Sequence, residues 1–130
     1  MKTKYGYGKQ VNLQFEDAVK RVYNDLQSEG FGVLTDIDVA AKIKEKLSLT
    51  IPPYRIIGAC IPSFANQALA VEPMVGLLMP CNIVVRENGD KQVFVDFQDP
   101  NFIFEAVGKE PIRPLMLEVN KKLQKIFEQL

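Results

Sequence analysis

The sequence predicts an α+β domain, with an antiparallel sheet and helices packed on one face of it. Several strand-like runs follow one another along the chain, and amphipathic helical stretches stand near both ends of the series. Runs of strands flanked by helices are typical of this fold class. A chain of 130 residues with 47% hydrophobic residues is long enough to bury one core, so we expect a single domain over residues 1–130.

The first half of the chain predicts strand, helix, strand and helix in turn. A strand is expected over residues 3–12, and the helix after it carries apolar residues at helical spacing until Gly30 ends it. Residues 31–35 predict a short strand, and Asp36 or Asp38 then caps a second helix. This second helix is expected to bury one side, formed by Val39, Ile43 and Leu47.

The second half predicts further strands, short helical insertions and a long terminal helix. Pro53 introduces a strand over residues 54–61, and Ser63 is the expected cap of a short helix that Pro73 ends. The next strand covers residues 81–87.

The remaining elements are marked by turn and cap residues. Asn88-Gly89 predicts a type I′ turn in a hairpin, and Asp99-Pro100 begins a short helix that ends at Gly108. The terminal helix is predicted by one apolar stripe, which consists of Ile112, Leu115, Met116, Val119, Leu123, Ile126, Phe127 and Leu130.

Composition argues against several classes of function. Sixteen basic and sixteen acidic residues give a net charge of zero, which offers no field to hold nucleic acid or an anionic membrane. No apolar run reaches the roughly 20 residues of a membrane span, and the first residues lack a signal-peptide core. Two cysteines without such a signal indicate reduced thiols in the cytoplasm. Because the chain has no histidine, Ser-His pairs, Cys-His pairs and imidazole-bound metals are excluded.

Two similar phrases each place a cysteine near a proline at the end of a β-prone run. If the two runs are neighbouring antiparallel strands, Cys60 and Cys81 approach each other at one strand end. The thiols are then either small buried hydrophobes or a redox or soft-metal pair, with zinc as the candidate metal. Two thiolates are half of a zinc site, so Glu72, Asn82 or a second subunit would have to complete it.

Other polar and aromatic residues have both a binding and a structural interpretation. Arg55 either binds an anionic ligand or faces solvent in a pair with Asp96 across the sheet. Asp36 and Asp38 either form a carboxylate pair, for acid–base chemistry or for a hard cation, or cap the following helix, which is the interpretation that we favour. Three tyrosines either line a pocket or pack within the sheet: Tyr5, Tyr7 and Tyr54.

Three phrases, GFGVLTDID (30–38), PYRIIGAC (53–60) and GLLMPCNIVV (76–85), resemble the bacterial and archaeal family called domain of unknown function 302. The resemblance extends over nearly the whole chain, in order. It implies a β-α-β4-α arrangement, grouped with TATA-box-binding-protein-like folds, and a homodimer. The apolar run of residues 74–79 is the expected dimer contact. DNA binding does not follow from the fold group, since one fold hosts many functions. Ile61 stands where the family often has Asn, so this chain lacks that polar group.

The sequence therefore favours a non-enzymatic homodimer that binds a small ligand or another protein in a groove between sheet and helices. The residues expected to contact a ligand are Arg55, Cys60, Cys81 and Asn82, and none is expected to be catalytic. The alternative is thiol-dependent soft-metal binding or redox sensing through Cys60 and Cys81. An enzyme that uses carboxylates and Arg55 ranks last, because no histidine is present and the acids are better explained as caps.

Overall fold

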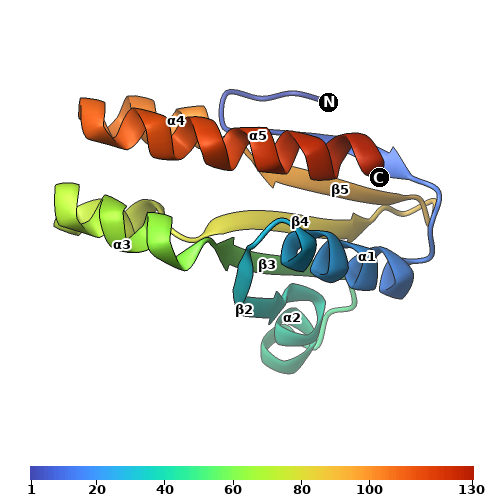
Figure 1. The fold of residues 1–130 in the computed structure, drawn as a ribbon. Coiled ribbons are helices and arrows are strands. Elements are labelled where there is room, and N and C mark those ends of the chain that lie inside the picture. Colours follow the sequence, from blue (N-terminus) through green and yellow to red (C-terminus); the bar gives the residue numbers. More distant parts are fainter.

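The computed structural model describes all 130 residues, and five antiparallel strands form one sheet in the order β1-β5-β4-β3-β2 (Figure 1). This arrangement confirms the predicted α+β class and the β-α-β4-α order with short helical insertions. The strands are β1 (Gly6–Val11), β2 (Gly32–Asp38), β3 (Tyr54–Cys60), β4 (Cys81–Glu87) and β5 (Val93–Gln98). The α-helices are α1 (Phe15–Ser28), α2 (Val39–Leu47), α3 (Pro62–Val71), α4 (Pro100–Val107) and α5 (Arg113–Gln129), with 3-10 helices η1 (Pro73–Leu78) and η2 (Glu110–Ile112).

Buried and partly exposed residues alternate along β4 and β5, so the sheet has one buried face and one open face. In β5, Val93, Val95 and Phe97 are buried on the side that α1 and α5 cover, and the residues between them lie on the other side (Figure 1). A cluster of 22 buried hydrophobic residues fills the space between the sheet and these helices. The groove expected between sheet and helices is therefore filled by the core, and the opposite face of the sheet has no helical layer over it.

β1 is shorter than the predicted strand, because the first residues turn back beside it. The Thr3 N–H donates to the Gly6 carbonyl at 2.8 Å, and the Gly8 N–H donates to the Met1 carbonyl at 3.0 Å. The helix after β1 ends as predicted. Gly30 adopts a φ of 85°, and the Phe31 N–H donates to the Leu26 carbonyl at 3.0 Å.

β2 and α2 differ from the prediction in two ways. β2 continues to Asp38, with a bulge at Val33/Thr35, and Asp38 caps α2 by accepting the Ala41 N–H at 2.9 Å. The expected buried side of α2 was wrong, because no residue of α2 is buried and Leu47 is 64% exposed. The helix follows the edge strand and lies outside the layer formed by α1 and α5, so no second layer covers it (Figure 1).

The start of α3 also corrects the prediction. Ser63 is not its cap, because the helix begins one residue earlier at Pro62, and Ile61 occupies the N-cap position without a side-chain hydrogen bond. Proline suits the first helical position, where an N–H has no helical acceptor.

The hairpin between β4 and β5 is confirmed, but its predicted type I′ turn was wrong. The positive φ, 61°, belongs to Lys91 rather than to Asn88 or Gly89. The Asn88 side chain instead accepts hydrogen bonds from the Asp90 and Gln92 N–H groups at 3.0 and 2.9 Å. This local Asn bonding favours a longer turn than the two-residue one.

The C-terminal part follows the prediction closely. Asp99 caps α4 through the Asn101 N–H at 2.9 Å, and Gly108 ends the helix with a φ of 68°. None of the helices is both long and apolar enough to cross a membrane. The apolar stripe begins in η2 and continues through α5, where its buried residues are Ile112, Leu115, Met116, Val119, Leu123 and Ile126.

Candidate functional site

Arg55 is engaged in an ion pair within the chain. Its Nε donates to Asp36 Oδ1 at 2.8 Å, and a second guanidinium nitrogen bonds the other carboxylate oxygen. The Tyr23 hydroxyl of α1 also bonds this carboxylate. The hydrogen bonds from Arg55 hold the pKa of Asp36 below its ordinary value. The predicted pairing of Arg55 with Asp96 was wrong, because β4 lies between β3 and β5.

Cys60 and Cys81 lie on neighbouring strands, as the thiol hypothesis required. Cys81 is directly opposite Ala59, so Cys60 is one residue out of register with it. Neither cysteine forms a disulfide, and both line a pocket of about 40 Å³ beside α3 and α5. Burial and the nearby Cys60 raise the pKa of the Cys81 thiol to about 11, and burial raises the pKa of Cys60. At neutral pH both groups are therefore thiols, which are weak nucleophiles.

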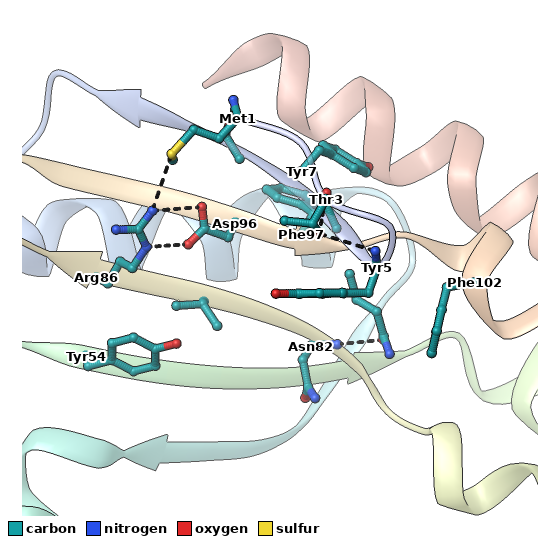
Figure 2. Close-up of a pocket in the computed structure, with 14 residues that line it drawn as sticks. Met1, Thr3, Tyr5, Tyr7, Tyr54, Asn82, Arg86, Asp96, Phe97 and Phe102 are labelled. Carbon is teal, nitrogen blue, oxygen red and sulfur yellow. Dashed lines mark hydrogen bonds and ion pairs between the residues drawn. The ribbon is translucent and has the colours of Figure 1, made fainter.

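The larger hollow lies on the open face of the sheet (Figure 2). It has a volume of about 450 Å³ and is bounded by β1, β3, β4, β5 and the first residues of the chain. We call it the open-face pocket. Asn82 lines it, whereas the three other predicted ligand-binding residues do not: Arg55, Cys60 and Cys81.

An ion pair forms one end of the open-face pocket. Arg86 of β4 donates from Nε to Asp96 Oδ2 of β5 at 2.6 Å, and its guanidinium lies 4.5 Å from the centre of the Phe94 ring. Asp96 has room for its carboxylate because Gly8, its partner on β1, has no side chain, and a Cβ there would collide with that carboxylate. The pair neutralises its own charge, and the other charged group at this end, the Met1 ammonium, donates to the Gly8 carbonyl at 3.0 Å.

Aromatic side chains form the walls of the open-face pocket. Tyr5 is 63% exposed and its ring lies along the sheet surface, with Tyr54 and Phe102 on either side of it in Figure 2. The backbone fixes Tyr5, since its carbonyl accepts the Asp99 N–H at 2.9 Å. Tyr7 belongs to the other face, where its ring packs against Phe97 and Phe127. Two of the three predicted tyrosines therefore bring their rings to one pocket.

Two amide side chains complete the open-face pocket. Gln98 Oε1 accepts the Asn82 backbone N–H at 3.2 Å, which holds the Gln98 side chain across the strand end and leaves its NH₂ group without a partner in the chain. The Asn82 side-chain amide is also exposed and makes no hydrogen bond within the chain. A bound molecule would meet aromatic faces together with hydrogen-bonding groups of both kinds.

Sequence reasoning did not single out Arg86 or Gln98 as site residues. A signal for each exists in the alternation of its own strand: Gln98 alternates with the buried residues of β5, and Arg86 alternates with Ile83 and Val85 of β4. The sequence does not show that β5 lies between β1 and β4. This strand order brings Arg86 and Gln98 to the same pocket as Tyr5.

Comparisons with known proteins agree with this architecture. The profile of the family described as "Domain of unknown function DUF302" matches residues 7–130. The crystal structure of an uncharacterized conserved DUF302 protein from Bacillus stearothermophilus superposes with a TM-score of 0.86, at 24% sequence identity, over 97% of this chain and 98% of that one. No curated protein matches the sequence. This chain therefore belongs to the DUF302 family, with a family match that covers both faces of the sheet and all five helices.

Proposed function

We propose that the protein is a homodimeric, non-enzymatic binding module that takes a small, uncharged, planar molecule into the open-face pocket. The observation that carries this proposal is the combination of Tyr5 and Tyr54 rings with the free amide groups of Asn82 and Gln98 in a hollow of about 450 Å³. Ligand pockets of this size bind apolar bodies and use a few polar groups to orient them.

The charges of the pocket favour an uncharged ligand. Arg86 and Asp96 are bonded to each other, so neither is free to balance a charged group on the ligand. A ligand with a net charge would have to break this pair or leave its own charge uncompensated. Aromatic rings bind planar molecules by stacking, and the amides can recognise carbonyl and N–H groups at the edge of such a ring.

The same arrangement favours binding over catalysis. The Asp96 carboxylate and the Arg86 guanidinium are bonded to each other, and the two cysteine thiols lie outside the pocket. A general base needs a group free to take a proton from the substrate, and a nucleophile needs such a base beside it.

The test is a nuclear magnetic resonance screen with uncharged one- and two-ring heteroaromatic compounds, and with the carboxylated form of each ring as a comparison. We expect uncharged compounds to shift the side-chain NH₂ signals of Asn82 and Gln98 more than their anionic forms do. Gln98→Ala should weaken binding about tenfold, the effect of one lost hydrogen bond. Gln10→Ala is the matched control, because Gln10 lies on β1 outside this pocket.

The proposal is wrong if no uncharged compound shifts these signals, or if Gln98→Ala binds as tightly as the unchanged protein. Preference for the carboxylated compounds would also contradict it, since that result would mean that Arg86 is available to an anion.

The homodimer in this proposal is supported by exposed apolar side chains at one end of the molecule. Met74 and Leu77 of η1 are 68% and 79% exposed, whereas Val75 between them is buried. Exposed Leu69 belongs to α3, which packs against η1. Adjacent large apolar side chains at a surface are typical of a contact between protein chains.

A further inference from the structure

The pocket of about 40 Å³ beside α3 and α5 concentrates the sulfur atoms of the protein. The chain has four methionines and two cysteines, and four of these six residues line this one pocket: Cys60, Met79, Cys81 and Met116. The other two, Met1 and Met74, are exposed elsewhere on the surface. Twelve of the thirteen lining residues are hydrophobic, so sulfur supplies nearly all of the metal-binding capacity there.

Three separate segments bring the sulfur residues to the pocket. Cys81 is the first residue of β4, and Met79 precedes it by two positions in extended backbone, with φ −119° and ψ 156°. The side chains of Met79 and Cys81 both pack against the core. Met116 comes from α5 and is 8% exposed, while Cys60 ends the neighbouring strand β3.

We propose that Met79, Cys81 and Met116 bind one monovalent soft metal ion, Cu(I), with Cys81 as its thiolate ligand and Cys60 at the side of the site. This site is independent of the open-face pocket. It differs from the zinc site expected from two thiolates, because it uses thioethers from two segments that the sequence reasoning did not consider.

Ligand type and charge both select a monovalent soft ion. Thiolate and thioether sulfur favour Cu(I), whereas neutral thioethers are poor ligands for zinc. One thiolate with one Cu(I) forms a neutral unit, which an apolar pocket accommodates at little electrostatic cost. Zinc with the same ligands would keep a positive charge in a pocket that has no acidic residue to balance it. No three His, Cys, Asp or Glu side chains gather elsewhere in the structure to compete for a metal.

Binding has to displace a proton. A cysteine is mostly a protonated thiol at neutral pH, and it binds a metal ion as the thiolate. The step is Cu(I) plus the Cys81 thiol giving the copper thiolate and one released proton, with no change of oxidation state. Proton release accompanies metal binding by any thiol, and its stoichiometry counts the thiolates formed.

The experiment is an anaerobic competition titration of the purified protein against Cu(I) buffered by bicinchoninic acid, with proton release recorded in a weakly buffered sample. We expect one equivalent of Cu(I) and one proton per chain. Cys81→Ser should abolish binding, and Met79→Leu and Met116→Leu should each weaken it at least tenfold. Methionine to leucine conserves volume, so these variants should keep the fold, which circular dichroism and the melting temperature verify.

Met74→Leu is the matched control, because Met74 is exposed and lies outside the pocket. It should bind Cu(I) as the unchanged protein does. Failure of the protein to withdraw Cu(I) from the chelator would overturn the proposal. So would Met79→Leu and Met116→Leu variants with unchanged affinity, or release of two protons, since both results would assign the metal to the cysteines alone.

Discussion

Arg55 bonds to Asp36 on the adjacent strand even though the register places Asp38, and not Asp36, directly opposite it. The diagonal pairing arises because the Asp38 carboxylate is occupied at the start of α2, where it accepts the Ala41 N–H. Two aspartates separated by one residue therefore have different roles. Asp36 joins the edge strand to β3 and to Tyr23 of α1, and Asp38 begins the helix.

The first prediction concerns Asp36→Asn, which should lower the free energy of unfolding by about 1–2 kcal/mol at pH 7, because a charge-assisted bidentate bond is lost. The folded-state pKa of Asp36 lies below its ordinary value of 3.8, so this stabilisation is fully present above that pH. It should disappear as the pH falls through the folded-state pKa. Urea unfolding of both proteins between pH 7 and pH 2 measures the difference.

Glu45→Gln is the control for this experiment, since Glu45 forms an exposed pair with Lys42 and its removal should change stability little. A stability difference for Asp36→Asn that stays constant down to pH 2 would mean that packing, and not the charge, carries the effect.

The second prediction separates the two aspartates. Asp38→Ala should destabilise the protein by about 1 kcal/mol through the lost N-cap of α2. Amide hydrogen exchange in α2 should accelerate, because no residue of this helix is buried and the cap is a large part of what holds its first turn. Ser63→Ala is the comparison, since Ser63 makes no capping bond in α3 and should cost no more than a few tenths of a kcal/mol. Equal losses in the two variants would contradict the assignment of the caps.

The elements that could be predicted from sequence are those whose signals are local and repeated. The α5 stripe and the limits of β4 came from patterns that the structure preserves, because the buried side of each element is set by its own spacing. The burial of α2 could not be predicted in the same way. Its apolar spacing resembles that of a covered helix, and only the position of β2 at the sheet edge leaves it uncovered.

The residues of the candidate site were harder to predict because strand order decides which of them meet. Arg55 and Asp96 looked complementary, yet β4 separates their strands and supplies Arg86 to Asp96. Asn82 was identified because it adjoins Cys81, and it lies in a different pocket from the one that the thiols suggested. The long-range pairing of β1 with β5, which positions Tyr5, has no local sequence signal.

The third prediction concerns the buried hydroxyl of Tyr7. This oxygen is shielded from solvent and has no hydrogen-bond partner, although the ring packs well against Phe127 with centroids 4.9 Å apart. Leaving a buried hydroxyl unpaired costs about 1–3 kcal/mol, so Tyr7→Phe should be neutral or stabilise the protein by about 1 kcal/mol. Chemical denaturation measures the change.

Tyr23→Phe provides the contrast, because the Tyr23 hydroxyl bonds to Asp36 and its removal should destabilise the protein. If Tyr7→Phe proved as damaging as Tyr23→Phe, the Tyr7 hydroxyl would have to bond a water or a ligand in solution.

The fourth prediction tests the homodimer through η1. Leu77→Glu places a charge on the most exposed large apolar side chain of the molecule, at 79% exposure. A charge buried in an apolar contact without a partner is strongly unfavourable, so the variant should be monomeric at concentrations where the unchanged protein is a dimer. Sedimentation equilibrium across a hundredfold range of concentration measures the shift from dimer to monomer.

Leu47→Glu is the matched control, because Leu47 is also exposed but belongs to α2, next to the edge strand β2 (Figure 1). If only Leu47→Glu gives a monomer, the dimer forms through the sheet edge and the role proposed for η1 is wrong. A monomeric unchanged protein would remove the dimer from the proposed function altogether.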